Sequence, residues 1–566
     1  MNTEVRFILA IGLMLVVLVG TNLLFPPQVP EEPLPGASPA AEQVDEAAGT
    51  GTTSPALPTS VGAAPEDAEP LVDPEVPSVA ERRVSVEGPL YRFTFSNLGA
   101  RLVSAEMLRF RALNRDGLVD LVPQGAEGYL GQRLLVGNDT VDMSRVPFDV
   151  LPSGGVTLHE GGGSQVLHFS YRHPTRDFGL DLEYEFRPEA YQVAVRGRVI
   201  GVDRPLLLTN LGEGLAYAEA DSAGESRAMA YVGNHVQEGI DSYPLGKAVP
   251  GIHEGPLLWA AFRSKFFVMA LLAGETEEAS EADYLGGLIV APSTLEGRVQ
   301  VATTQTVGSD GAFGYRLFMG PQEYARLSSL GEDMEEVNPY GWRFFRPIVR
   351  PLVSAITWVL TFLHNQLNLG YGWVLILFGV LMRVVLWPLN QKAMVSQLKN
   401  MAVQPQIQEI QARYKDNPEK LQKEMMRLYR EEGFNPFGGC LPMLLPWPVL
   451  IALFFVFQNT IELRGVSFLW MPDLSAPDPL YILPVFLGIS MFLMQWFSMR
   501  AIEQQNQQMK MMMYIMPVMM VFIFFKLASG LNLYYATANI ATIPQQIWIN
   551  NERKKMKGQM AAAKKD

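Results

Sequence analysis

The chain has 566 residues, of which 48% are hydrophobic and only 18% are charged, whereas soluble globular proteins average about 25% charged residues. Its net charge of −13 is divided unevenly, because residues 341–566 carry 22 basic and 12 acidic residues and the preceding part carries 23 and 46. A single cysteine excludes an intrachain disulfide framework and a cysteine-rich zinc or iron–sulfur site. The six histidines include no His-x-x-x-His pair, so the sequence gives no support to metal-dependent hydrolysis. The length of the chain predicts more than one domain.

Residues 1–25 are predicted to form an uncleaved N-terminal transmembrane anchor. Residues 5–25 are almost entirely apolar, and about 20 such residues cross a hydrocarbon core about 30 Å thick. A cleavable signal peptide is the alternative, although the apolar run ends in Leu24-Phe25-Pro26 rather than at a pair of small residues. Residues 26–80 then contain twelve prolines and ten acidic residues but no basic or aromatic residue, a composition that predicts a disordered linker.

Residues 81–330 are predicted to form one large β-sandwich domain. Apolar and polar residues alternate over 91–96, 182–186 and 191–196, which is the pattern of half-buried antiparallel strands. Glycine-rich turn signals separate these runs from one another. A single sandwich is the simplest interpretation, since such domains reach about 250 residues.

Two glutamates in this domain are candidates for acid/base chemistry, because Glu183 and Glu185 lie on one face of a predicted strand. A solvent-facing row, opposite a row of buried apolar residues, is the favoured interpretation of the same pattern. The loop at 161–164 is rich in glycine but lacks the lysine and the strand–loop–helix setting of a phosphate loop, which favours a hairpin turn. Nothing in the sequence selects a sugar, a peptide or another ligand for the domain.

The chain becomes strongly apolar after residue 339. Residues 340–370 are predicted to form an interfacial amphipathic helix and a lead-in to the bilayer, because three arginines are interspersed with aromatic residues at its start. Residues 371–549 are predicted to form a five-helix membrane core, with spans at 371–389, 441–461, 481–497, 511–527 and 531–549. A turn at Ser529-Gly530 is expected to join the last two spans, and a re-entrant pair over 511–549 is the alternative.

Basic residues predict the orientation of these spans, since loops rich in lysine and arginine stay in the cytoplasm. Residues 390–436 carry eight basic residues and the tail at 550–566 carries six, whereas residues 462–480 carry only Arg464. The predicted fold class is therefore a polytopic α-helical membrane protein with six transmembrane helices and a large extracytoplasmic β-sandwich domain. Both termini are expected in the cytoplasm.

Residues 390–436 are predicted to form a cytoplasmic helical hairpin with a narrow apolar seam and a charged exterior. Asn417-Pro418 supplies a capping residue followed by a proline at the first helical position. Two roles stay open for this hairpin: support of the helix bundle, or contact with client proteins in the cytoplasm.

Arg383 is the only charged residue between Tyr371 and Leu389, and an arginine in the middle of a bilayer costs at least about 2.5–3.5 kcal/mol. One interpretation is that its side chain reaches toward the interface near Asn390, and the other is a hydrated cavity open to the cytoplasm. The second is favoured because no span supplies a carboxylate partner. Acidic residues of a transiting polypeptide are then suitable anions. The spans also contribute uncharged polar side chains, among them Gln458, Gln495, Tyr534, Tyr535 and Asn539.

Ten methionines lie between residues 491 and 520. Flexible thioether side chains suit surfaces that accept many apolar partners. Ordinary packing against lipid is the favoured alternative for most of them, so the methionines are compatible with client binding without requiring it.

Three motifs in the membrane half follow one another in a specific order. They are NPFGGCLP at 435–442, DLSAPDPLYILP at 473–484 and SGLNLYY at 529–535, with Arg383 in the span before the first of them. In this order, they resemble the YidC/Oxa/Alb family of membrane protein insertases over about residues 340–555. The linker and the β domain resemble the form of the family found in Gram-negative bacteria, in which the resemblance implies a β super-sandwich.

The resemblance implies a protein of the bacterial inner membrane that inserts and folds nascent membrane proteins, alone or with the SecYEG translocon and SecDF. It implies contact with the lipid bilayer, but no cofactor, metal, catalytic residue or enzymatic activity. Contact with ribosomes through the hairpin and the basic tail is a further expectation, and no specific nucleic-acid sequence is expected as a partner.

The resemblance also implies a substrate groove. Arg383 matches the family's groove arginine, and Tyr535 matches a tyrosine that faces the substrate. Gly379 stands where relatives carry a threonine that contacts substrate, and a glycine there is expected to widen the groove. The complete set of candidate groove residues is Arg383, Tyr535, Gly379, Tyr534, Gln495 and Gln458.

Two other classes of function are the alternatives. A small-solute transporter is expected to show inverted repeats and broken helices around a midplane site, and the sequence shows no such halves. A membrane-anchored sugar-binding or sugar-acting protein is expected to have its chemistry in residues 81–330. Removal of most of that domain separates these ideas, since an insertase is expected to keep its core activity and the sugar enzyme is expected to lose all of it.

Overall fold

The computed structural model describes residues 80–136, 139–202, 205–274, 283–293, 295–338, 346–388, 391, 406, 409–410, 413–414, 417–431, 447–499 and 507–563. The predicted anchor, nearly all of the predicted linker, the NPFGGCLP motif and most of the first hairpin helix lie outside the described residues. The side-chain contacts described below lie within one compact unit, residues 69–503 and 513–566.

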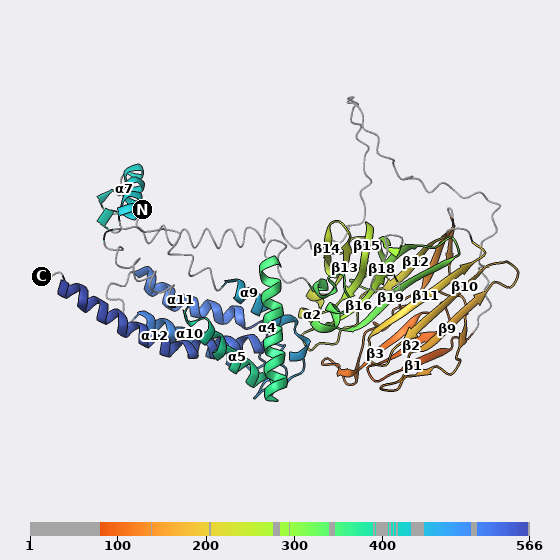
Figure 1. The fold of residues 1–566 in the computed structure, drawn as a ribbon, viewed down its shortest axis with the longest axis horizontal. Helices are drawn as coiled ribbons and strands as arrows, with labels where there is room; N and C mark the ends of the chain where they lie inside the picture. The colour runs from red at the N-terminus through yellow and green to blue at the C-terminus, as the bar shows by residue number, and fades with distance from the viewer. Residues whose placement is uncertain are drawn as a thin grey trace, which may run out of the picture. The chain divides into compact units, whose positions relative to one another are not determined.

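The described strands of the N-terminal half form two sheets (Figure 1). The smaller has five strands in the order β4 (Leu118–Asp120), β3 (Leu102–Arg111), β2 (Tyr91–Ser96), β1 (Arg83–Glu87) and β8 (Val156–Thr157). The larger follows the order β6 (Asp139–Asp142), β5 (Gln132–Val136), β12 (Leu206–Gly212), β18 (Val299–Thr306), β17 (Leu285–Pro292), β15 (Gly251–Arg263), β16 (Phe267–Ala273), β19 (Ala312–Pro321), β11 (Gln192–Ile200), β10 (Gly179–Phe186), β9 (Gln165–Arg172) and β7 (Asp149–Leu151). Strands β13 (Ala230–His235) and β14 (Gly239–Pro244) extend it beside β15.

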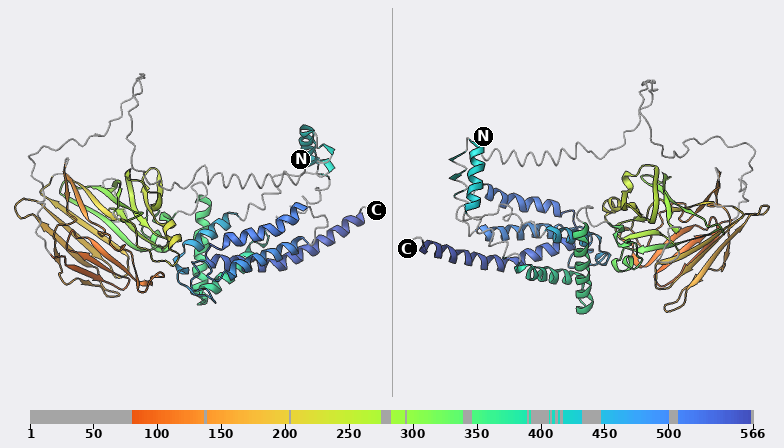
Figure 2. Two further views of the ribbon diagram at one scale, coloured as in Figure 1. Left: turned by 180° about the vertical axis from the view of Figure 1, so that it is seen from behind. Right: turned by 45° about the horizontal axis from the view of Figure 1, so that its top comes forward.

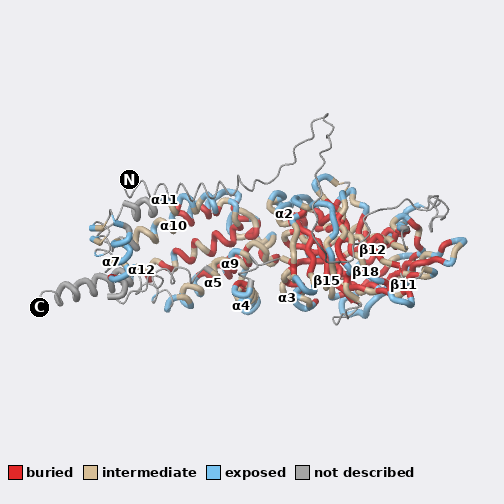
Figure 3. Tube along the Cα trace, turned by 90° about the horizontal axis from the view of Figure 1, so that it is seen from above, coloured by how far each residue is buried: buried red, intermediate tan, exposed pale blue. Residues whose placement is uncertain are grey.

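Side chains from the two sheets meet in one hydrophobic core, which confirms the predicted β-sandwich. Strand β2 coincides with the predicted run at 91–96, and its residues Tyr91, Phe93 and Phe95 are buried. Phe95 packs against Tyr184 of β10, with the ring centroids 5.1 Å apart. Figure 3 shows buried chain along strands β11, β12, β15 and β18 of the larger sheet.

Glu183 and Glu185 face away from this core, as the favoured interpretation predicts. Arg196 on the adjacent strand β11 lies 3.7 Å from Glu183 and 3.3 Å from Glu185, and such cross-strand ion pairs are typical of a partly exposed sheet surface. The chain does turn at Gly161, between β8 and β9. Strand β8 pairs with β1, whereas β9 pairs with β7 and β10. Because β8 and β9 do not pair with each other, the predicted hairpin is wrong.

Several short helices of the described residues lie between or after the strands. They are α2 (Ser222–Ala228), η1 (Leu245–Lys247), α3 (Tyr324–Ser328), η3 (Met334–Val337) and, in the membrane half, η4 (Ile461–Leu463). Helix α2 begins after Asp221, whose carboxylate accepts a hydrogen bond from the Gly224 N–H at 2.9 Å. This satisfies one of the free N–H groups of its first turn.

The described helices of the membrane half are α4 (Arg346–Leu367), α5 (Tyr371–Val385), α7 (Pro418–Glu431), α9 (Trp447–Asn459), α10 (Ile482–Met499), α11 (Gln507–Phe524) and α12 (Ser529–Ala563). Helix α12 contacts α5, α9 and α10, and α4 contacts α5 and α9 (Figure 2). These helices share a second hydrophobic core, to which α4 contributes Val349, Val353, Ile356 and Leu360 at helical spacing. The opposite side of α4 exposes Trp358 and Phe362, so both faces of this helix are apolar.

By length and composition, one described helix, Pro347–Leu367 within α4, is long and apolar enough to cross a membrane. Four further helices are apolar but shorter, namely Tyr371–Val385, Pro448–Asn459, Ile482–Phe497 and Tyr514–Phe524. Each of the five predicted spans overlaps a helix of the structure, although residues 441–446 lie outside the described residues and α12 runs beyond the predicted end at residue 549. The lengths of these helices do not establish the predicted number of six transmembrane helices.

The start of α12 differs from the prediction. Ser529 and Gly530, predicted to form a turn, are the first two residues of the helix. Their N–H groups, which have no partner within the helix, donate to the carbonyl oxygens of Ala476 at 2.7 Å and Leu474 at 2.8 Å. The helix then continues to Ala563, so the described part of the predicted tail at 550–566 is helical.

The second helix of the predicted cytoplasmic hairpin is confirmed as α7. Its capping residue is Asn417, whose side-chain oxygen accepts a hydrogen bond from the Lys420 N–H at 3.1 Å. Pro418 occupies the first helical position, where the absence of an N–H group has no cost.

Candidate functional site

Arg383 lies in the last turn of α5. The preceding part of this helix is buried in the helical core through Val374, Leu375 and Phe378. At 1.5 Å per residue, Arg383 is about 18 Å along the helix axis from Tyr371. If Tyr371 marks one boundary of a hydrocarbon core about 30 Å thick, the backbone of Arg383 lies just past the midplane of that core.

A cavity of about 340 Å³ lies beside Arg383, among α5, α9, α10, α11 and α12. Its polar lining comes from Arg383, Tyr534, Tyr535 and Asn539. Its apolar lining comes from Met382, Leu386, Val449, Leu450, Leu487, Met491, Met520 and Phe524. The lining therefore combines one charged group with a mainly apolar wall.

Helix α12 supplies the other polar groups of the lining. Tyr534 is 4% exposed, and its ring packs 5.7 Å from that of Phe378 and 5.6 Å from that of Phe457. Tyr535 contacts Phe524 edge-on at 5.3 Å. Asn539 lies one turn further along the helix. The aromatic contacts hold the two tyrosines at fixed positions in the cavity wall.

The charge of Arg383 has no anionic partner in the described part of the chain. No aspartate or glutamate lines the cavity, whose other polar groups are the uncharged side chains of Tyr534, Tyr535 and Asn539. An unpaired cation in a mainly apolar wall requires water or an anion from another molecule. The site is therefore suited to transient binding of a carboxylate.

Comparison with known proteins covers both halves of the chain. A family model described as "60Kd inner membrane protein" matches residues 362–557, and one described as "YidC periplasmic domain" matches residues 83–355. The membrane protein insertase YidC of Chlorobium limicola is 31% identical over 505 residues, which cover 84% of this chain and 84% of that protein. The corresponding insertase of Chlorobaculum tepidum is 32% identical over 506 residues, with 83% and 82% covered.

The chain belongs to the YidC family of membrane protein insertases. It is accordingly an inner-membrane protein with a periplasmic β-sandwich domain. A crystal structure of an active YidC insertase with its first transmembrane domain resolved is similar with a TM-score of 0.33 and 20% identity, covering 82% of this chain and 92% of that one. The resemblance predicted from the three motifs is confirmed.

The structure brings together three of the six candidate groove residues of this YidC-family chain. Arg383, Tyr534 and Tyr535 line the cavity, whereas Gly379, Gln458 and Gln495 do not. Gln495 points toward α11, where its Nε2 donates to the sulfur of Met516 at 3.8 Å. Gln458 lies at the C-terminal end of α9, two residues before Thr460, and takes no part in the lining.

Gly379 lies where α5 packs against α12. A Cβ atom at this position would lie 3.3 Å from Cγ2 of Thr537 and 3.4 Å from the carbonyl oxygen of Tyr534. The glycine therefore lets α5 and α12 approach closely, as small residues do between membrane helices, and the widening of the groove at this position stays a prediction.

Asn539 and the apolar lining residues were not among the candidates. Asn539 was visible as a polar side chain in the last span, and its spacing of four residues from Tyr535 places both on one helix face. Its side-chain amide donates to Ser490 Oγ at 3.2 Å, which connects α12 to α10. Met491 and Met520 are the two lining residues from the methionine-rich segment.

Gly488 on α10 is expected to be the more sensitive of two helix-packing glycines. A Cβ atom at this position would lie 2.3 Å from Cγ2 of Val521 on α11, and the branched side chain of valine has few alternative rotamers. Gly488→Ala should therefore lower the free energy of unfolding by about 1–3 kcal/mol, measured by thermal or denaturant unfolding of the full chain in detergent.

The control for this change is Gly379→Ala, where the nearest atom would be 3.3 Å away and the loss should be smaller. Val521→Ala removes the clashing methyl groups and should restore most of the stability lost in Gly488→Ala. A Gly488→Ala variant as stable as the wild type, or one that Val521→Ala does not rescue, contradicts the predicted packing of α10 on α11.

Proposed function

We propose that the cavity beside Arg383 is the client-binding part of an insertion groove, through which the chain inserts and folds nascent membrane proteins. The observation that carries this proposal is a single unpaired cation in a mainly apolar cavity, formed by five helices. Such a site can attract the carboxylates of a passing polypeptide, and it contains no anion that competes for them within the described residues.

Insertion has one large barrier, which is the transfer of a polar client segment through about 30 Å of hydrocarbon. A hydrated groove shortens this path, and the positive charge of Arg383 attracts acidic residues of the client segment. Burial of the client's apolar helix in lipid, at about 25 cal/mol per Å², together with the membrane potential, then completes the transfer. The attraction has to stay weak, because the client must leave the groove.

The proposed topology has six transmembrane helices with both termini in the cytoplasm. The basic residues at 390–436 and 550–566 support this orientation. The β domain and the loop around Arg464 then lie on the periplasmic side, and the groove opens toward the cytoplasm.

The proposed partners are nascent membrane proteins, the lipid bilayer, the SecYEG translocon and SecDF. Ribosomes are a further proposed partner, with α7 and the basic end of the chain as the contact region. The chain is proposed to act by binding alone, without a catalytic centre, cofactor or metal.

Site-specific photocrosslinking tests the groove directly. A photoactivatable residue at position 535 should crosslink to nascent membrane proteins during insertion, because Tyr535 lines the cavity. Position 514 is the matched control, since Tyr514 is a tyrosine on α11 that is 58% exposed and lies outside the lining. Crosslinks of equal yield from both positions, or none from position 535, contradict the proposal.

A further inference from the structure

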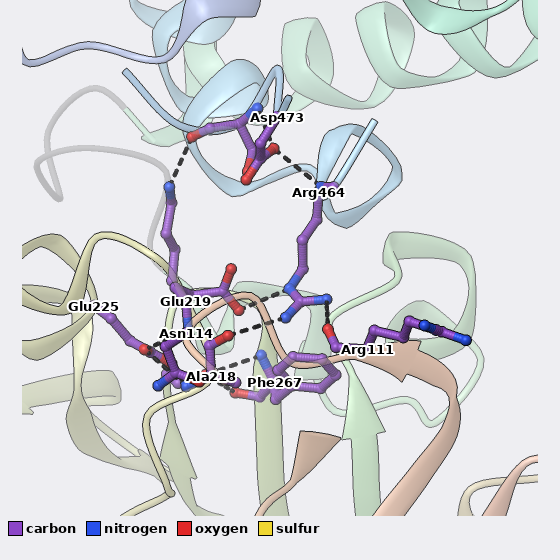
Figure 4. A network of polar contacts seen from close by, with 12 residues as sticks. Arg111, Asn114, Ala218, Glu219, Glu225, Phe267, Arg464 and Asp473 are labelled. Carbon is purple, nitrogen blue, oxygen red and sulfur yellow. Dashed lines mark hydrogen bonds and ion pairs between the residues drawn. The ribbon is translucent and has the colours of Figure 1, made fainter. Parts of the chain in front are cut away.

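Arg464 joins the loop between α9 and α10 to the β domain through a buried ion pair (Figure 4). Its Nε lies 2.7 Å from Oε1 of Glu219, and the two side chains are 3% and 5% exposed. The guanidinium also donates to the carbonyl oxygens of Arg111 at 2.9 Å and Ala218 at 3.4 Å, and it lies 5.3 Å from the ring centroid of Phe267. These contacts all come from the β domain, and together they hold the guanidinium in one orientation.

A second contact ties the same loop to the β domain. Lys265 Nζ donates to the carbonyl oxygen of Ser475 at 2.9 Å. The loop is closed on itself by Asp473, whose Oδ1 accepts from the N–H groups of Gly465 at 3.0 Å and Ser475 at 2.8 Å. Arg464 and Lys265 therefore hold two points of a loop that is itself cross-linked by Asp473.

The loop also takes part in both hydrophobic cores. Ile461 is 4% exposed and belongs to the core of the β domain. Leu463, two residues further on, is fully buried in the core of the helices. Movement of this segment would therefore disturb the packing of both domains at once.

The far end of the loop positions α12. The carbonyl oxygens of Leu474 and Ala476 accept hydrogen bonds from the first two N–H groups of α12, those of Gly530 and Ser529. Tyr535 follows Ser529 by six residues, or about 9 Å of helix rise. A displacement of the loop is thus transmitted over a short, rigid distance to a tyrosine of the cavity wall.

We propose that Arg464 is a positioning residue for insertion, and that its ion pair with Glu219 lets the β domain hold Tyr535 in place. The inference rests on the proposed function of the cavity and adds a role for the β domain at that site. In this proposal, the β domain binds the loop at 464–476 and restricts its movement. The loop in turn fixes the start of α12, and α12 places Tyr535 where the client binds.

Three variants of the full chain test this inference in membranes. Arg464→Met and Glu219→Gln remove one charge each from the ion pair, and Lys265→Met removes the second contact while keeping an apolar stem. Arg172→Ala is the matched control, because the ion pair of Arg172 with Asp181 joins β9 to β10 within the β domain and the Arg172 side chain is 54% exposed. Two measurements apply to each variant: hydrogen exchange of the amides at 466–476 and 529–535, and client crosslinking from position 535.

Removing one partner of a buried ion pair leaves the other uncompensated, so amide exchange at 529–535 should rise at least about tenfold in Arg464→Met and Glu219→Gln. Client crosslinking from position 535 should fall in parallel, and Lys265→Met should show both effects more weakly. The Arg172→Ala control should match the wild type in both measurements.

The inference is overturned if exchange rises at 466–476 but neither exchange at 529–535 nor crosslinking from 535 changes, since the loop would then move without α12. It is equally overturned if the Arg464 and Glu219 variants match the control. Failure of the proposed function can be told apart from failure of this inference. It would appear as absent crosslinking from position 535 in the wild type, and the exchange measurements would still decide whether Arg464 positions α12. If Arg464→Met does not fold, Lys265→Met decides by the same criteria.

Discussion

Arg383→Ala is expected to reduce insertion of client proteins with acidic N-terminal tails at least about fivefold, whereas Arg383→Lys should keep most of it. A positive and a negative charge 4 Å apart attract each other by about 4 kcal/mol at an effective dielectric constant of 20. Hydration of the groove reduces this value, and a residual 1 kcal/mol already corresponds to about a fivefold effect. The ammonium group of lysine supplies the same charge, although it lacks the bidentate geometry of arginine.

The measurement is protease protection of the client tail in cells depleted of the wild-type protein. A client whose tail has every Asp and Glu replaced by Asn and Gln is the control, because its insertion should not depend on the charge at position 383. Full insertion of acidic-tailed clients by Arg383→Ala would show that the cavity does not act through its charge. Equal losses for acidic and neutral tails would instead point to a structural role for Arg383.

The candidate residues that line the cavity were found in the sequence by different signals. Arg383 is a charge within an apolar run, and the sequence alone shows that no span offers it a carboxylate. Tyr535 was identified only through the family resemblance. Gly379 was assigned to the groove through the same resemblance, and Gln458 and Gln495 were assigned from their membrane depth, but depth does not reveal which neighbouring helix a side chain faces. That depends on the packing of several helices against one another.

The role of Arg464 could not be predicted for a related reason. In the sequence, Arg464 is the only basic residue between residues 462 and 480. The scarcity of basic residues there indicated the orientation of the membrane spans, and nothing in the sequence indicated a partner for Arg464. Its partner Glu219 is 245 residues earlier in the chain, on a different domain. Local patterns predicted the β-sandwich and the helices of the membrane half, because strand and helix periodicity is local, whereas the contact between the β domain and the helices is set by tertiary structure.

Glu225 contacts the backbone beside the ion pair of Arg464 with Glu219, and it is expected to make the stability of the β domain depend on pH. Its carboxylate accepts hydrogen bonds at 3.0 Å from the N–H groups of Ala218 and Glu219, the residues that contact Arg464. Burial raises the pKa of Glu225 from its ordinary 4.5 to about 7, and the neighbouring charge of Glu219 adds to the increase, while the two backbone hydrogen bonds and Arg464 oppose it. A carboxyl group with a raised pKa in the folded state favours folding when it is protonated.

The contribution of Glu225 to stability should therefore be complete below pH 4.5 and be lost as the pH rises to about 7. At about 1.4 kcal/mol per pH unit, the free energy of unfolding should decrease by roughly 2–3 kcal/mol between pH 5 and pH 8. Urea unfolding of the full chain in detergent, followed by pulse proteolysis of the β domain, measures this change. Glu225→Gln should remove most of it, and Glu160→Gln, an exposed position, should not. A wild-type protein equally stable at both pH values would contradict the prediction, and so would a Glu225→Gln variant that keeps the wild-type dependence.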